Sequence, residues 1–278
     1  TSVDPFGFIS NVYETITPLP FRYYYPDSDD INESQKTYIQ NHIYEFETLL
    51  NSSNFNDPLY GYKNWINMNS TIDFFIIQEF TKNIDAYRAS TFFYKDKSST
   101  NDTIYFGPIW DFNFAYGSVT FCQGDQYQGW QYENKCSDQS SLFWFKRFLD
   151  DAEYINMLNC RWMDLRNNIL SEESIFNVID SLSNSINEAV SRDLEKWHNN
   201  KTMIDYEDKI SELKNWIDNR LDWIDLSIAG NCEMDLLEYS SQKSLMRTVD
   251  ILGRENQGTG FQLKIYDDGS VSKQFIKN

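Results

Sequence analysis

The stretch from about Ser70 to Lys82 is apolar on nearly all sides, and it constrains the fold more than any other feature of the sequence. A surface helix carries one apolar stripe, whereas a helix that is hydrophobic all round lies inside a core. Ser70 and Thr71 are candidate N-caps, and Asp73 falls in the first turn, where the helix dipole favours an anion. We therefore predict a central helix here, with the other elements packed around it.

The composition agrees with a core of this kind. Of the 278 residues, 41% are hydrophobic and 17% are aromatic, which is more than a disordered acidic segment carries. The 24 Lys and Arg against 42 Asp and Glu give a net charge of −18. We therefore expect no nucleic-acid partner, because such proteins present a basic face to the phosphates. No run of about 18 apolar residues occurs, so we expect no membrane span.

Helical periodicity continues on both sides of the central segment. A helix is predicted from Asn32, with one apolar stripe, and loop residues end it at 51–58. After the loop between Cys122 and Cys136 the chain is predicted to be helical to about Ile228. Further helices are expected over 142–149 and 152–166, from Ser171 onward, and over a last stretch that ends near Ile224. We interpret their apolar stripes as ordinary core faces; the stripe after Ser171 comprises Ile175, Ile179, Leu182, Ile186, Ala189 and Leu194.

Two regions have strand character instead. Residues 90–95 and 103–106 are short, β-branched and aromatic, with a turn between them, and they predict a hairpin. Residues 249–255 and 261–266 predict a small β unit that follows a Ser-rich joint near Ser240. The fold class is therefore α+β and mainly α, with one domain over residues 1–238 and a β tail over 239–278.

Two aspartates flank the predicted hairpin. Asp85 follows the central helix, and Asp111 follows the second strand, 26 positions later. Phosphotransferases of the protein-kinase type present this order: one Asp orients the acceptor hydroxyl, and a second holds Mg²⁺ against the nucleotide phosphates. The same pattern also occurs with a purely structural role, so the order alone leaves both readings open.

The four cysteines point to an oxidising compartment. Cys122 and Cys136 bracket a polar, aromatic loop that a disulfide can close, and the even count in an acidic chain agrees with export. Four free buried thiols in a cytosolic enzyme are the alternative. Zinc is not expected, because no CxxC pair occurs.

Two motifs resemble the CotH kinase family, which includes atypical secretory-type protein kinases. They are Phe75-Ile-Ile-Gln-Glu-Phe-Thr-Lys-Asn-Ile-Asp-Ala-Tyr-Arg-Ala-Ser-Thr91 and Gly107-Pro-Ile-Trp-Asp-Phe-Asn-Phe-Ala-Tyr-Gly117, and the similarity extends from about Phe21 to Asp225. The resemblance implies the helical C-lobe of an atypical kinase-like fold, with the hairpin at the active site. It also implies ATP and Mg²⁺ as cofactors and Ser or Thr of a secreted or surface protein as acceptor.

The resemblance assigns roles to individual residues. Asp85 corresponds to the catalytic aspartate and Asp111 to the aspartate that binds the metal, and Asn113 supports the same site. Ser90 stands where the spore coat branch has an asparagine, an expected second metal ligand. Asn83 is a candidate for orienting Asp85, and a helix C-cap is its alternative role.

The glycine-rich lid and phosphate-binding Lys of a kinase have no counterpart near the start of the sequence. The first 70 residues contain only Gly7 and Gly61, so we expect the nucleotide lobe to lie upstream. Two functions therefore stay open: an exported kinase, or an inactive surface binding or scaffold module of the same fold. A third reading is a carbohydrate binder that uses the aromatic loop from Gln123 to Trp130.

The tail carries a second resemblance. Val249-Asp-Ile-Leu-Gly-Arg-Glu255 and Ile265-Tyr-Asp-Asp-Gly-Ser-Val271 are similar to the C-terminal sorting segment of type IX secretion substrates. This implies a Bacteroidota origin, the type IX machinery as a partner, and a location outside the cell or on its surface. Resemblance to the CotH relatives also implies that Cys160 and Cys232 pair with each other.

Overall fold

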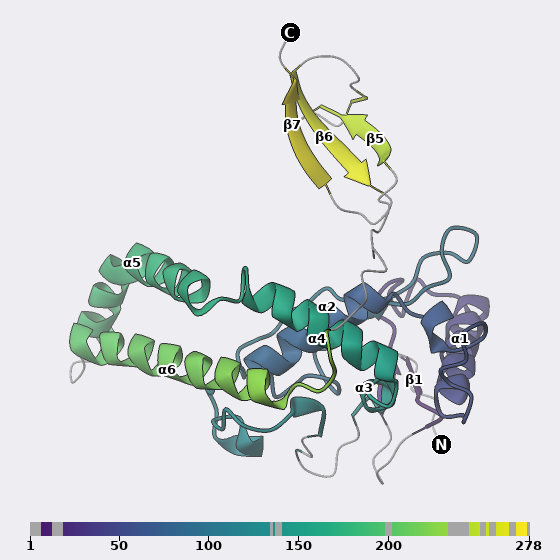
Figure 1. The fold of residues 1–278 in the computed structure, drawn as a ribbon, viewed down its shortest axis with the longest axis horizontal. Coiled ribbons are helices and arrows are strands. Elements are labelled where there is room, and N and C mark those ends of the chain that lie inside the picture. Colours follow the sequence, from purple (N-terminus) through teal and green to yellow (C-terminus); the bar gives the residue numbers. More distant parts are fainter. Residues whose placement is uncertain are drawn as a thin grey trace. The chain divides into compact units, whose positions relative to one another are not determined.

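The computed structural model describes residues 7–12, 19–133, 136, 141–197, 202–232, 245–250, 254–255, 260–266 and 271–276. The chain divides into two compact units, Thr1–Cys232 and Glu233–Asn278. Figure 1 shows both units, coloured along the sequence, with most of their elements labelled.

Helix α2 (Met68–Thr81) is the centre of the first unit, as its all-round apolar character predicts. It begins slightly before the predicted start, because the side chain of Asn67 caps it by accepting the Ser70 N–H at 2.8 Å. Helix α1 (Glu33–Leu50) lies in the same unit and begins next to Asn32, where the sequence predicts a helix to start. The Asn32 side chain caps it by accepting the Gln35 N–H. Both helix predictions are confirmed.

An aromatic core surrounds α2. Phe74 and Phe75 of α2 each lie 5.9 Å from the ring of Phe145, and Tyr87 lies 4.8 Å from the same ring. Phe145 belongs to α3 (Trp144–Phe148), which is buried on most of its surface. A buried aromatic side chain removes about 150–250 Å² of its surface from water. This cluster of rings is therefore a main source of the stability of the unit.

Three longer helices complete the unit: α4 (Ala152–Arg166), α5 (Glu172–Trp197) and α6 (Met203–Ser227). The predicted disulfide between Cys160 of α4 and Cys232 is present, with 4.8 Å between the Cα atoms. It closes a segment of 72 residues that contains both α5 and α6, which disfavours the unfolded chain by about 4 kcal/mol on loop-closure grounds. The predicted Cys122–Cys136 disulfide is also present.

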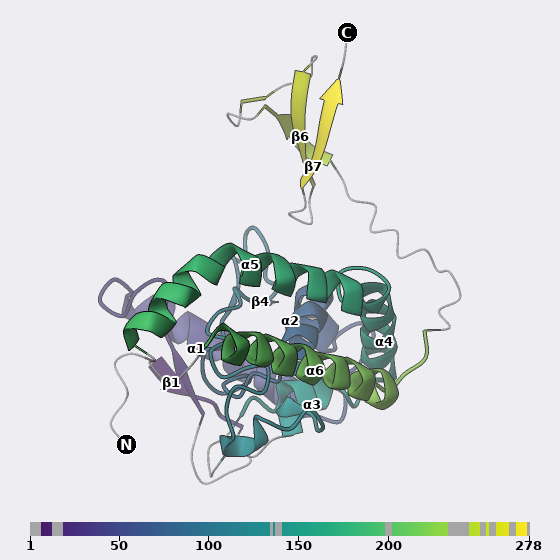
Figure 2. The same cartoon turned by 90° about the vertical axis from the view of Figure 1, so that its left-hand side faces the viewer.

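The apolar stripe of α5 is only partly a core face. Ile175, Phe176 and Ile179 pack against the core, but Leu182 is 63% exposed and Ile186 is 49% exposed. Figures 1 and 2 show α5 running alongside α6 as a helical hairpin that extends from the rest of the unit. The prediction of a core face is therefore wrong beyond Ile179, because only the first turns of α5 have a core beneath them. No helix among the described residues is both long and apolar enough to cross a membrane.

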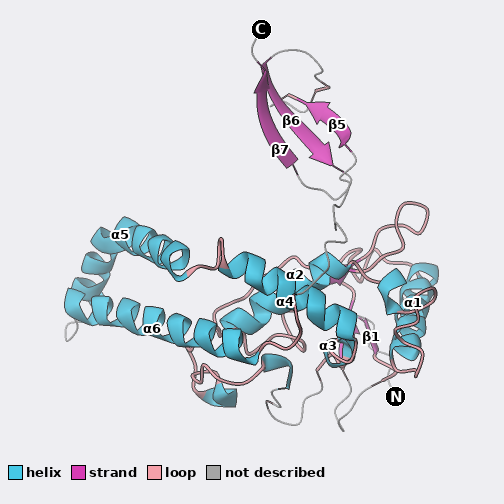
Figure 3. Ribbon diagram, in the orientation of Figure 1, coloured by secondary structure: helices cyan, strands magenta, loops and turns pink. Residues whose placement is uncertain are grey.

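The strands of the first unit are short (Figure 3). Strands β1 (Gly7–Ile9) and β2 (Pro20–Arg22) pair antiparallel. The predicted hairpin is confirmed as β3 (Phe93–Tyr94) and β4 (Tyr105–Phe106), in which Phe93 pairs with Phe106. Single 3₁₀ turns lie at Tyr62–Asn64, Phe121–Gln123 and Gln131–Glu133.

The second unit is a three-stranded antiparallel sheet in the order β5–β6–β7. Its strands are β5 (Leu245–Val249), β6 (Gly260–Tyr266) and β7 (Val271–Ile276). The small β unit is therefore present, although its first strand ends at Val249, where the sequence predicts a strand to begin. The predicted turn at 267–269 and the joint at Ser240 lie outside the described residues.

Candidate functional site

Asp85 lies four residues beyond Thr81, the last residue of α2. Lys82 is the C-cap of α2 and adopts the left-handed conformation, with φ of 46°. Asn83, for which the sequence allows a C-cap as the alternative role, is therefore not the cap. Asn83 is buried, and its side-chain carbonyl accepts the N–H of Asp85 at 3.2 Å. Its amide donates to Gln78 at 3.1 Å, which fixes the side chain. Asn83 therefore orients the backbone that carries Asp85.

The Asp85 carboxylate pairs with a cationic side chain, that of Arg88. Its Oδ1 lies 3.5 Å from a guanidinium nitrogen of Arg88, and the two side chains are 20% and 15% exposed. Arg88 also donates to the carbonyl of Cys136 at 3.2 Å. Asp85 is thus accessible at the surface and is partnered by a side chain that has a second anchor.

Asp111 lies on the loop that leaves β4. The hydroxyl of Ser90 donates to Asp111 Oδ2 at 2.9 Å, so the structure brings these two predicted residues together. Asn113 is on the same loop but is exposed, and its backbone carbonyl accepts the Ser118 hydroxyl at 2.9 Å. The described residues show no hydrogen bond from the Asn113 side chain to Asp111 or Ser90.

Two backbone hydrogen bonds join the segment of Asp111 to that of Asp85. The Ile84 N–H donates to the Phe114 carbonyl at 3.2 Å, and the Tyr116 N–H donates to the Thr81 carbonyl at 2.8 Å. The hairpin adds a third constraint, because the Gly107 N–H donates to the Phe92 carbonyl at 2.9 Å. The chain between the two aspartates thus folds back, and the two segments lie against each other.

The backbone around these side chains is strained. Tyr87, Ser90, Asp111 and Tyr116 have φ between 45° and 67°, although none is a glycine. Such left-handed residues cost about 1–2 kcal/mol each and persist where the surroundings hold them. The surrounding fold therefore holds the backbone of Ser90 and Asp111 in place.

Asp111 and Ser90 carry oxygen atoms of the kind that Mg²⁺ prefers. Among the described residues, no three His, Cys, Asp or Glu side chains are grouped to hold a metal ion. Asp111 and Ser90 offer a carboxylate and a hydroxyl. Mg²⁺ commonly takes one or two carboxylates and receives its other oxygens from substrate phosphates and water.

A buried ionic network lies beneath the site, and sequence reasoning missed it. The Glu79 carboxylate accepts the hydroxyl of Tyr87 at 2.9 Å and the backbone N–H groups of Gln131 and Tyr132 at 2.7 and 2.9 Å. Arg220 of α6 lies 3.5 Å from it and is fully buried. Burial raises the pKa of Glu79, and the Arg220 charge and these donors oppose that rise. One signal in the sequence could have revealed the network. Arg220 lies on the buried face of α6, between Ile217 and Leu221, where an apolar residue is expected.

Two buried cations hold the disulfide-bonded loop. Lys82 Nζ donates to the carbonyls of Gln126 (2.8 Å) and Gln128, and Arg220 donates to those of Tyr127 (2.6 Å) and Gly129 (2.8 Å). Four consecutive carbonyls thus point at two cations. This contact ties the loop to the end of α2, next to Asp85.

Lys82 makes the stability of the protein depend on pH. Burial, with help from Arg220, lowers the pKa of Lys82 to about 8 in the folded protein. The ordinary pKa of a lysine is about 10.4. Between pH 8 and this value, Lys82 binds its proton in the unfolded chain but not in the folded protein, so the contribution of Lys82 to the free energy of unfolding rises with pH. We expect the free energy of unfolding of the wild type to gain about 1–3 kcal/mol relative to Lys82→Met between pH 7 and 10. Urea unfolding of both proteins measures this difference; parallel pH profiles would contradict it.

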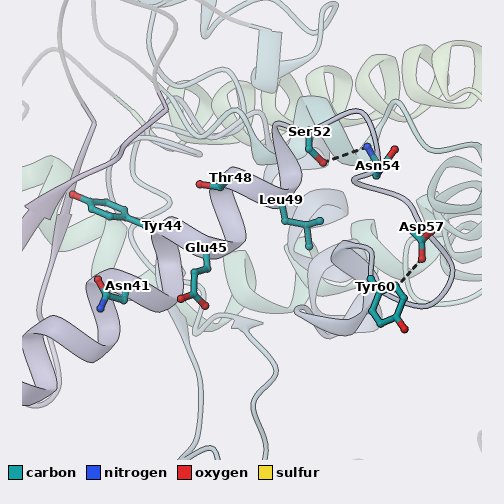
Figure 4. A pocket seen from close by; sticks show the side chains of 9 residues that line it. All are labelled: Asn41, Tyr44, Glu45, Thr48, Leu49, Ser52, Asn54, Asp57 and Tyr60. Atoms are coloured by element: carbon teal, nitrogen blue, oxygen red, sulfur yellow. Dashed lines mark hydrogen bonds between the residues drawn. The ribbon is translucent and has the colours of Figure 1, made fainter.

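A separate hollow lies along α1 and does not include either aspartate (Figure 4). The residues that line it come from α1 and from the loop that follows this helix. It is therefore distinct from the site around Asp111.

The comparisons with known proteins agree with the two motifs. The model of the family described as CotH kinase protein matches residues 20–224, which include Asp85, Asp111 and the helices from α1 to nearly the end of α6. A comparison with curated proteins gives no match. Because the family match covers well over half of the sequence, the chain belongs to the CotH kinase protein family.

Proposed function

We propose that this chain is a kinase-like phosphotransferase that uses Mg-ATP and a Ser or Thr hydroxyl of a secreted or surface protein. The observation that carries the proposal is the pairing of Ser90 with Asp111 at 2.9 Å, on a segment hydrogen-bonded to the turn that carries Asp85. Membership of the CotH kinase family supports the same reaction class.

The proposed roles follow from the chemistry of phosphoryl transfer. Asp111 would hold Mg²⁺ through a carboxylate oxygen, and Ser90 would add a hydroxyl oxygen. The bound ion neutralises the charge of the phosphates. Asp85 accepts the proton of the acceptor hydroxyl, and Asn83 keeps the backbone of Asp85 in position.

Calorimetric titration with Mg-ATP tests this proposal. We expect Mg-ATP to bind the wild type and to bind Asp111→Asn at least about tenfold more weakly, because an amide brings no charge to the cation. Asn adopts the left-handed conformation of position 111 readily, so this variant should remain folded. Asp96→Asn, on the exposed turn of the hairpin, is the matched control and should bind as the wild type does.

An inactive binding or scaffold module is the second candidate. The observation that favours it is Arg88, which lies 3.5 Å from the carboxylate of the proposed base. If neither the wild type nor Asp111→Asn takes up Mg-ATP, the kinase proposal fails for this chain and this candidate replaces it.

We also propose that the protein is exported and that its C-terminal unit acts as a type IX sorting segment. Two disulfides within Thr1–Cys232 support an oxidising destination. The separate three-stranded unit supports a role for the tail that is independent of the first unit. Secretion of the whole chain, compared with a chain that ends at Cys232, tests this; equal export of both would contradict it.

A further inference from the structure

The hollow along α1 has a volume of about 650 Å³ and is built from two segments (Figure 4). Helix α1 presents Asn41, Glu45 and Thr48 on one face, and the loop after the helix adds Asn54, Asp57 and Tyr60. From Asn41 to Leu49 the lining face of the helix extends about 12 Å along the helix axis. The hollow is thus an elongated surface groove.

The loop that forms one side of the groove is rigid. The Asp57 carboxylate accepts the N–H groups of Leu59 and Tyr60 at 2.8 and 2.9 Å, and the Asp57 carbonyl accepts that of Gly61 at 2.8 Å. A Cβ atom at Gly61 would approach backbone atoms of Asp57 and Phe55 to 2.4–2.7 Å, so the closure is tight enough to require glycine.

This rigid loop holds two apolar side chains outside the core. Leu59 is 74% exposed and Tyr60 is 76% exposed. A loop whose backbone is already held in position loses little backbone entropy when a ligand covers its side chains. The arrangement is therefore better suited to binding than to stability.

The lining combines aromatic faces with polar groups. Figure 4 shows Tyr44 at one end of the groove and Tyr60 at the other, with Leu49 between them. Among the described residues, the side chains of Asn41 and Glu45 and the hydroxyl of Tyr60 form no hydrogen bond within the protein. A carboxylate accepts several hydroxyl protons, and an amide both donates and accepts. These groups are available to a ligand rich in hydroxyls.

The charge of the groove excludes anionic ligands. Its described lining contains the carboxylates of Glu45 and Asp57 and no Lys, Arg or His. The chain as a whole carries a net charge of −18. Phosphate, sulfate or carboxylate groups would therefore meet repulsion from the two lining carboxylates.

We propose that this groove binds a neutral oligosaccharide. The C–H face of a sugar ring packs on Tyr60, and the sugar hydroxyls donate to Glu45 and exchange hydrogen bonds with Asn41. The length of the groove exceeds that of a single ring, so the ligand is a chain of sugars. Because the groove shares no residue with the site around Asp111, this function is independent of phosphoryl transfer.

The proposal is tested by calorimetric titration of the whole chain with three neutral hexasaccharides: cellohexaose, xylohexaose and chitohexaose. We expect at least one of them to bind, and Tyr60→Ala to weaken that binding about tenfold. The exposed position of Tyr60 predicts an unchanged thermal unfolding midpoint, so a loss of binding reports the contact itself.

Two controls locate the site. Tyr25→Ala removes a tyrosine that is 91% exposed and lines a different hollow, and it should bind as the wild type does. An acidic hexagalacturonate should bind at least about tenfold more weakly than the neutral ligand. The proposal is overturned if none of the three hexasaccharides binds, or if Tyr60→Ala binds as well as Tyr25→Ala.

Discussion

Replacing Arg220 with methionine is expected to lower the free energy of unfolding by about 3–5 kcal/mol. Arg220 is fully buried, and it donates to the carbonyls of Glu79, Tyr127 and Gly129. Burial lowers the pKa of Arg220 to about 10, so the side chain is still a cation at neutral pH. Methionine would fill most of the space but would leave these carbonyls without their donor and the Glu79 carboxylate without its cation.

Urea unfolding at pH 7 measures this loss. Arg192→Met is the matched control, because Arg192 pairs with Glu188 on the surface of α5 and its removal should cost less than about 1 kcal/mol. Glu79→Gln combined with Arg220→Met should cost less than the sum of the two single changes, since the two groups interact directly. Equal stabilities of the Arg220 and Arg192 variants would show that the buried network does not contribute as described.

Apolar periodicity predicts most helices of this protein because core faces repeat every three to four residues. It correctly predicts α2 as central, since a helix without a polar face has no exposed position to occupy. It fails for the outer part of α5, where Leu182 and Ile186 are exposed. A stripe shows that a face is apolar, but it does not show which element covers it.

The site divides in the same way. Motifs that are local in sequence single out Asp85, Ser90 and Asp111, and their catalytic and metal-binding roles stay predictions. The hairpin between Ser90 and Asp111 is visible in the sequence as a change of period. The contact between Glu79 and Arg220 joins positions 141 apart, and no local pattern encodes such a pairing. The left-handed backbone at Ser90 and Asp111 is also not predictable, because the surrounding structure imposes it against local preference.

Replacing Asp85 with asparagine is expected to reduce phosphate transfer at least about 100-fold while Mg-ATP binding stays within about twofold of the wild type. An amide has nearly the shape of the carboxylate but cannot take the proton of an acceptor hydroxyl at neutral pH. Arg88 keeps its bond to the Cys136 carbonyl, and Asn83 still accepts the N–H of residue 85, so the local structure should persist. This result rests on the proposed kinase function.

Two measurements distinguish the proposed base from the proposed metal ligand. One is the transfer of the γ-phosphate from radiolabelled ATP to an acceptor protein that contains Ser and Thr, and the other is calorimetric titration with Mg-ATP. Asp111→Asn should lose both binding and transfer, whereas Asp85→Asn should lose transfer alone. Asp222→Asn, on the exposed face of α6, changes the net charge equally and should retain both. If Asp85→Asn transfers phosphate as fast as Asp222→Asn, Asp85 is not the base. The pairing with Arg88 would then be its role, because an ion pair with 15–20% exposure can stabilise the turn without taking part in proton transfer.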